Sequence, residues 1–185
     1  PPTRLDDEGF ILVYLPFEDQ DSVTALLSRL PSQRFVQYAR DLPPGISGNV
    51  TRRSASTEGF KKHLASCSGV ICNSGFELIS ECLQWRKRVL TKPLHGQMEQ
   101  LSNALALGQL GYACPVPALS VEAIANWLET PRPAPAIEFA DVAAELARWL
   151  ANGCADTPAS LATRLWRLPH GALPTTPTHP LPTAA

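Results

Sequence analysis

Short apolar runs alternate with amphipathic segments over the first 130 residues. The apolar runs carry β-branched and aromatic residues and stop at proline, glycine or polar positions, which is typical of buried strands. The segments between them repeat apolar residues three and four positions apart, which predicts helices with one buried face. The expected strands are 10–15, 34–39, 49–52, 69–72, 88–91 and 112–114, and the expected helices are 23–30, 57–65, 76–85, 99–110 and 121–128.

This alternation predicts βαβ units and a mostly parallel sheet. Right-handed crossovers place the helices on both faces of such a sheet. We therefore expect an α/β protein, a Rossmann-like three-layer α/β/α sandwich with a mostly parallel sheet of about 5–6 strands. Residues 42–48 are expected to form a loop, and Asp21 or Ser22 is expected to cap the first helix.

The chain divides into four parts by composition. Residues 1–9 are polar and are expected to be loose, and residues 10–130 form the Rossmann-like domain. Residues 131–168 hold a proline-rich linker and two helices, near 141–150 and 159–168, which are expected to pack on the domain. The tail, 169–185, is rich in proline and threonine without an apolar period, so it is expected to be disordered.

Charge and hydropathy exclude several classes of protein. With 16 basic and 17 acidic residues, the chain lacks the basic excess of a nucleic-acid binder. It has neither an apolar run of about 18 residues, as a transmembrane helix needs, nor a secretory signal. We expect a cytoplasmic protein without nucleic acid as a partner. The chain begins at Pro1 and not at Met, which is consistent with a fragment that lacks a partner domain.

Cysteines and histidines do not predict a metal site. The five cysteines are odd in number and never spaced as CxxC, and the four histidines supply no paired ligands. Most of the cysteines lie in apolar contexts, so we expect buried, reduced thiols.

Two polar loops follow neighbouring predicted strands and should meet at the carboxyl edge of the sheet, where open α/β sheets bind ligands. In the first loop, Asn73-Ser74-Gly75, a glycine lets the backbone approach a ligand. The helix that follows, from Phe76, offers free N–H groups and a partial positive charge to a diphosphate. The alternative is an ordinary turn and helix cap.

Two carboxylates follow on one face of that helix, Glu77 and, one turn later, Glu81. An ionised carboxylate can accept both vicinal hydroxyls of a ribose, although a solvated acidic first turn would have the same sequence. In the second loop, His95 could contact a phosphate or lie free on the surface. Beyond it, the run from Gln97 to Gln100, with Glu99, could bind sugar hydroxyls or simply begin a helix.

Taken together, these residues resemble the donor-binding half of GT-B glycosyltransferases. The nearest resemblance is to the group around the bacterial enzyme that adds N-acetylglucosamine to lipid-linked muramyl peptide, with its uncharacterised relatives. The shared pattern is a glycine turn, a glutamate six positions later, a proline twelve positions after it, an acid-Gln pair and Asn-Ala. Here these positions are Gly75, Glu81, Pro93, Glu99-Gln100 and Asn103-Ala104.

The resemblance implies a role for each part of this motif. Glu81 would bind the ribose, Ser74-Gly75-Phe76 would face the diphosphate, Glu99-Gln100 would read the sugar, and residues 54–57 would contact the base through their backbone. Asn73, Glu77, His95 and Gln97 complete the expected donor site. The donor would be a nucleotide-sugar, usually a UDP-sugar, and the family needs neither a bound divalent metal nor a further cofactor. Residues 93–100 are spaced differently from plant-type members.

The implied function is the donor-binding half of a metal-independent inverting glycosyltransferase, which transfers a hexose or N-acetylhexosamine. The family's general base lies in an N-terminal acceptor domain, so we expect no catalytic residue in this chain and little transfer by it alone. The intact enzyme could contact a membrane peripherally. Two alternatives stay open: half of a nucleotide-sugar epimerase, or a non-catalytic flavodoxin-like or receiver-like module. No GxGxxG follows Leu15, which argues against a dinucleotide dehydrogenase.

Overall fold

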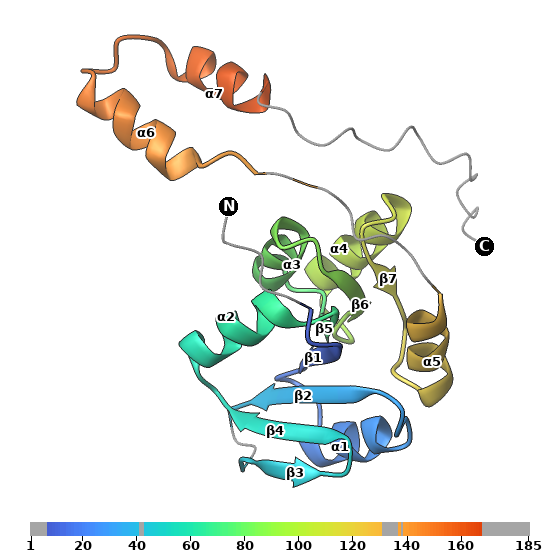
Figure 1. Ribbon diagram of the computed structural model, residues 1–185. Coiled ribbons are helices and arrows are strands. Elements are labelled where there is room, and N and C mark those ends of the chain that lie inside the picture. Colours follow the sequence, from blue (N-terminus) through green and yellow to red (C-terminus); the bar gives the residue numbers. More distant parts are fainter. Residues whose placement is uncertain (1–6, 41–42, 131–136, 138, 168–185) are drawn as a thin grey trace, which may run out of the picture. The chain divides into compact units, whose positions relative to one another are not determined.

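The computed structural model describes residues 7–40, 43–130, 137 and 139–167 (Figure 1). Contacts divide the chain into two units, Pro1–Pro135 and Ala136–Ala185. The first unit contains the predicted domain, and the expected packing of the later helices on it stays a prediction. The tail expected to be disordered lies outside the described residues.

The first unit is built on one mostly parallel sheet. Within the described residues it has seven strands in the order β3-β4-β2-β1-β5-β6-β7, and every neighbouring pair is parallel except β3 and β4. This confirms the predicted α/β class. The strands are β1 (Phe10–Tyr14), β2 (Arg34–Ala39), β3 (Gly45–Ser47), β4 (Val50–Ser54), β5 (Gly69–Asn73), β6 (Arg88–Lys92) and β7 (Cys114–Pro115).

Strand β3 corrects the expectation of a plain loop over 42–48 and raises the strand count above the expected 5–6. It pairs with β4 through Ile46↔Thr51 and the adjacent residues. The connecting loop has two residues, and Gly48 has a φ of +57°, which glycine adopts without the strain of a side chain. The strand has three residues, of which Ile46 alone is a large apolar residue, so the sequence shows no apolar alternation from which a strand could be predicted.

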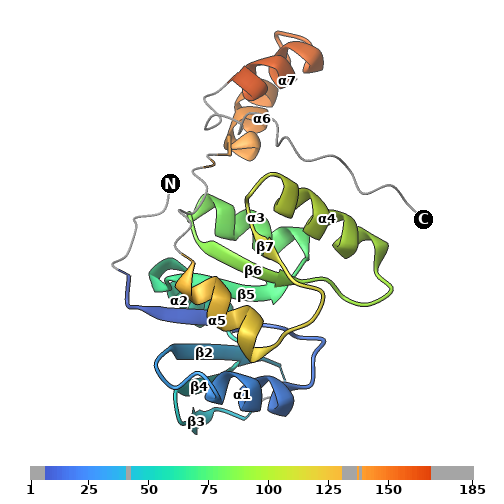
Figure 2. The same cartoon turned by 90° about the vertical axis from the view of Figure 1, so that its right-hand side faces the viewer.

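Helices cover both faces of the sheet, as the right-handed crossover rule requires. Figure 2 looks onto the face covered by α1 and α5, and α2, α3 and α4 connect the strands on the other face. Asp19 caps α1 by accepting a hydrogen bond from the Ser22 N–H at 2.9 Å, so the expected cap at Asp21 or Ser22 is wrong. The helices are α1 (Gln20–Ser28), α2 (Thr57–Ser66), α3 (Phe76–Gln84), α4 (Met98–Gln109) and α5 (Val121–Glu129).

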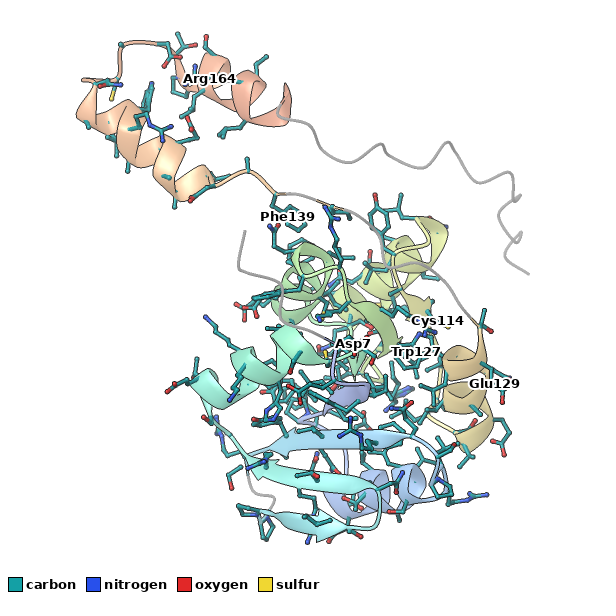
Figure 3. The ribbon with its side chains drawn as sticks, viewed as in Figure 1. Asp7, Cys114, Trp127, Glu129, Phe139 and Arg164 are labelled. Atoms are coloured by element: carbon teal, nitrogen blue, oxygen red, sulfur yellow. The ribbon has the colours of Figure 1, made fainter. Side chains whose placement is uncertain are left out.

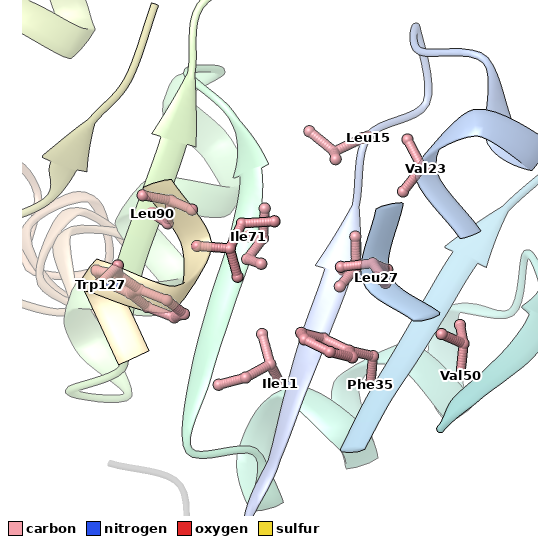
Figure 4. Close-up of a cluster of buried hydrophobic side chains, with 11 residues drawn as sticks. Ile11, Leu15, Val23, Leu27, Phe35, Val50, Ile71, Leu90 and Trp127 are labelled. Carbon is pink, nitrogen blue, oxygen red and sulfur yellow. The ribbon is translucent and has the colours of Figure 1, made fainter. Parts of the chain in front are cut away.

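The core lies between the sheet and the α1/α5 face (Figure 4). Alternate residues of β1 point into it together with one residue each from β2, β4, β5 and β6. Trp127 packs there from α5, with Cys114 partly buried against the same cluster (Figure 3). The buried members are Ile11, Val13, Leu15, Val23, Leu27, Phe35, Val50, Ile71, Leu90, Ile124 and Trp127.

The described part of the N-terminal segment is tied to the domain, although looseness was expected for 1–9. The Glu8 N–H donates to the Ser66 carbonyl at 2.9 Å, and Ser68 donates to Asp7 at 2.6 Å. In the second unit, α6 (Val142–Ala151) and α7 (Pro158–Arg167) form near the predicted positions. Over the described ranges, no helix is long and apolar enough to cross a membrane.

Buried Lys87 holds the C-terminal end of α2. Its Nζ donates to the carbonyl oxygens of Ala65 and Cys67, each at 2.8 Å, and the side chain is 6% exposed. A cation at the negative end of a helix is favourable, and hydrogen bonds to charged groups contribute about 1.5–3 kcal/mol each.

Lys87→Met should therefore lower the free energy of unfolding by about 1–3 kcal/mol, because two buried carbonyls lose their charged donor while the cost of burying the ammonium is relieved. Chemical denaturation measures this change. Lys62→Met, on the exposed face of α2, is the control and should change stability by less than about 0.5 kcal/mol. Equal stabilities of the two variants would contradict the assignment.

Candidate functional site

The sheet has one point where its chain order reverses. From β1 the chain crosses through α1 to β2 on one side, whereas β5, reached through α2, lies on the other side of β1. The loops that follow β1 and β5 therefore leave in opposite directions. In open α/β sheets, the crevice at such a point is where ligands bind.

Two adjoining cavities occupy this position. The larger, about 490 Å³, and the smaller, about 280 Å³, share four lining residues: Tyr14, Ala55, Glu77 and Leu78. The larger is lined in addition by Pro16, Phe17, Arg40, Cys72, Asn73, Gly75 and Gln100. The smaller is lined in addition by Tyr38, Ser56, Thr57, Phe60, Lys61 and Glu81.

Helix α3 begins at the larger cavity without a capping side chain. Its N-cap is Gly75, in extended backbone with φ −69° and ψ 135°, and the described residues form no side-chain cap hydrogen bond there. A Cβ built on Gly75 would meet no described atom within 4 Å. Glycine is therefore required neither by backbone strain nor by the protein's own packing, and the space beside it is open to a ligand.

Asn73 lies in the wall of the same cavity and is 7% exposed. Its Nδ2 donates to the Lys92 carbonyl at 3.1 Å and to Glu18 Oε1 at 3.4 Å, which fixes the orientation of the amide. Lys92 Nζ in turn pairs with Glu18 Oε1 at 2.5 Å. The buried Asn73 Oδ1 has no hydrogen-bond partner within the described structure. A buried acceptor left unpaired costs free energy, so it favours a ligand or water that donates to it.

Gln100 joins the two predicted loops. Its Oε1 accepts from the Ser74 N–H at 3.2 Å and from the Leu94 N–H at 3.0 Å. The Ser74 side chain is fully buried, with its hydroxyl 2.8 Å from that of Thr91, and Asn103 donates to the Ser74 carbonyl at 3.1 Å. Ser74, Gln100 and Asn103 thus have structural roles that sequence analysis did not predict, and sugar reading by Gln100 stays a prediction.

The two carboxylates of α3 lie beside the loop between β4 and α2. Glu77 and Glu81 both line the smaller cavity, together with Ser56 and Thr57 from the β4–α2 loop. The resemblance assigns that loop to the base and Glu81 to the ribose of one nucleoside. In the structure the loop and Glu81 line the same cavity. Glu77 also lines the larger cavity, so the two chambers are continuous along α3.

Aromatic rings form one wall of the smaller cavity, and sequence analysis missed them. Tyr14 and Tyr38 each contact Phe60 edge-on, with ring centroids 5.3 Å apart. The Tyr38 hydroxyl also bonds His63 Nδ1 at 2.8 Å, and burial raises the pKa of Tyr38 and lowers that of His63. The neutral forms are therefore favoured. Tyr14 is the last residue of β1 and Tyr38 the next to last of β2, so their proximity follows only from the sheet order.

The remaining predicted residues do not line either cavity. Phe76 is 65% exposed at the start of α3, and His95, Gln97 and Glu99 are exposed around the start of α4. Nothing in the structure tests their part in sugar binding. In the described parts of the chain, no group of three or more His, Cys, Asp or Glu side chains could hold a metal ion.

A family model described as Glycosyl transferase family 1 matches residues 3–131, more than half of the chain. The chain belongs to this glycosyltransferase family. The matched range contains the whole sheet, both cavities and every predicted site residue. The family therefore supports a role in glycosyl transfer.

Solved GT-B glycosyltransferases share the fold of this glycosyltransferase-family chain. The glycosyltransferase of kitacinnamycin matches with TM-score 0.53 and 18% identity, over 70% of this chain and 38% of its own. Spinosyn forosaminyltransferase SpnP matches with TM-score 0.54 and 14% identity, over 80% and 45%. SnogD from Streptomyces nogalater matches with TM-score 0.50 and 20% identity, over 70% and 37%.

Each match covers only part of the solved enzyme. The chain spans less than half the length of each of these three enzymes. At such identities the likeness shows the fold alone. No curated protein matches the sequence significantly.

Proposed function

We propose that this chain is the donor-binding part of a GT-B glycosyltransferase. Its proposed ligand is a nucleotide-sugar, and a UDP-sugar is the first candidate. The observation that carries the proposal is the alignment of three features along one crevice. These are the aromatic wall with Ser56 and Thr57, the carboxylates of Glu77 and Glu81, and the uncapped start of α3 at Gly75. They suit a base, a ribose and a diphosphate in that order.

Each feature matches its ligand group by chemistry. Carboxylates accept hydrogen bonds from vicinal hydroxyls, and a helix N-terminus with open space beside it attracts an anion. Asn73 lines the larger cavity, and its Oδ1 could accept a hydrogen bond from a hydroxyl of the sugar. A receiver-like module gains no support, because β4 ends in Arg52-Arg53-Ser54 without the aspartate that such a module phosphorylates.

The proposed reaction is metal-independent transfer of a hexose or N-acetylhexosamine with inversion. An acceptor hydroxyl attacks the anomeric carbon, the bond from that carbon to the β-phosphate oxygen breaks, and UDP leaves. The N–H groups of α3 stabilise the charge that develops on the leaving diphosphate. The base that takes the acceptor proton would come from an acceptor domain, as in the family around the N-acetylglucosaminyltransferase of lipid-linked muramyl peptide. This chain alone is then expected to bind donor without transferring it.

Glu81→Ala should weaken UDP binding about tenfold to a hundredfold, because it removes a charged acceptor for ribose hydroxyls. Isothermal titration calorimetry with UDP and UDP-sugars measures the effect, and NAD, FMN and acetyl phosphate should not bind. The control is Glu129→Ala at the exposed end of α5, which should bind UDP like the wild type (Figure 3). A folded Glu81→Ala variant with wild-type affinity would remove Glu81 from the site.

A further inference from the structure

The larger cavity has one cationic lining residue among those described, and the sequence motif does not include it. Arg40 directly follows β2, and it lines the cavity together with Asn73, Gly75 and Gln100. Among the described lining residues, Glu77 is the one acidic side chain. Within the described residues, the Arg40 guanidinium forms no hydrogen bond or ion pair.

The topology places Arg40 across the crevice from the start of α3. Strand β1 lies between β2 and β5, so the end of β2 is two strand spacings, roughly 10 Å, from the end of β5. The residues that follow β1, Pro16 and Phe17, lie between them in the cavity lining. The two positively polarised groups, a guanidinium and a helix N-terminus, thus flank one space from opposite sides.

A second observation in this space points to a ligand. Asn73 is more than nine-tenths buried and lines the cavity, and its Oδ1 has no partner among the described atoms. The Lys92 carbonyl and Glu18 hold its Nδ2, so the amide keeps its acceptor side unpaired. An occupant that satisfies both ends of the space carries an anionic group and a hydroxyl, as a nucleoside diphosphate sugar does.

We propose that Arg40 binds the pyrophosphate of the donor, opposite the N-terminus of α3. This inference rests on the proposed function and adds to it a residue from a different strand and loop. A guanidinium binds phosphate oxygens in a bidentate manner, which gives direction as well as charge. Arg40 then contributes to affinity for the diphosphate and nothing to affinity for the nucleoside.

The test compares Arg40→Gln with the wild type for UDP, uridine and inorganic pyrophosphate by calorimetry. The expected result is about tenfold weaker binding of UDP and of pyrophosphate, with uridine unchanged. Arg40→Lys should lose part of the UDP affinity, since it keeps the charge and loses the bidentate geometry. Arg29→Gln is the matched control, because it removes the same charge from an exposed position at the end of α1.

The outcomes separate this inference from the proposed function. UDP and pyrophosphate affinities equal to wild type in Arg40→Gln would overturn the role of Arg40, whatever Glu81 does. Pyrophosphate binding that depends on Arg40, without any UDP binding by the wild type, would keep the anion site and reject the nucleotide-sugar. A wild-type protein that binds neither UDP nor pyrophosphate would reject both.

Discussion

Gly75→Val should abolish nucleotide binding and leave the domain folded. Gly75 has extended backbone, and a Cβ there would meet no described atom within 4 Å, so the free protein accommodates a larger side chain. The isopropyl group would instead fill the space beside the first N–H groups of α3. We expect UDP affinity to fall at least about a hundredfold, because the diphosphate could no longer approach those groups.

Stability and ligand choice provide the controls for Gly75→Val. The free energy of unfolding should stay within about 1 kcal/mol of wild type, since restriction of the unfolded chain offsets a weaker helix cap. Uridine, which lacks the diphosphate, should bind as before. A folded variant that binds UDP with wild-type affinity would show that the diphosphate does not lie at this glycine.

Gln100→Met should damage both stability and binding. The methionine fits a similar volume but cannot accept the N–H groups of Ser74 and Leu94, which Gln100 Oε1 accepts at 3.2 and 3.0 Å. Each buried N–H left without a partner costs about 1–3 kcal/mol, so we expect a loss of about 2–4 kcal/mol and a Tm lower by roughly 5–15 °C. Because Ser74 precedes Gly75, the displaced loop should also weaken UDP binding.

Gln97→Met is the matched control for this variant. Gln97 is exposed at the start of the same helix and makes no side-chain cap hydrogen bond, so the substitution should change stability by less than about 0.5 kcal/mol. Thermal denaturation distinguishes the two variants. Similar Tm values for Gln97→Met and Gln100→Met would contradict the bridging role of Gln100.

Most of the fold could be predicted from the sequence because each element has a local pattern. The run Phe10–Tyr14 is apolar throughout because β1 is covered on both faces, and Ser56 and Ser120, residue types that favour helix starts, cap α2 and α5. Strand β3 was not predicted because an edge strand of three residues, Gly45-Ile46-Ser47, is too short to show such a pattern. The order of the strands also fixed the crevice, which local patterns alone could not locate.

The site was predictable where one element supplies it and not where several meet. Glu77, Glu81 and Gly75 lie on one helix or at its start, and all three line the crevice, while their part in donor binding stays a prediction. Arg40 and the rings of Tyr14 and Tyr38 reach the crevice from other strands, so no spacing along the chain connects them to the motif. Gln100 shows a third case, since its partners are backbone N–H groups, which every residue type except proline carries.

The bridge from Gln100 to Ser74 also has a consequence for the order of events during synthesis. The glycine turn and both carboxylates of α3 leave the ribosome before the residue that fixes the turn, which lies 26 positions after Ser74. A nascent chain that stops at β6 would contain the glycine turn but lack the Gln100 side chain that accepts the Ser74 N–H. Competence for the nucleotide should therefore arise late, when α4 docks, and the ligand should select completed domains over partial ones.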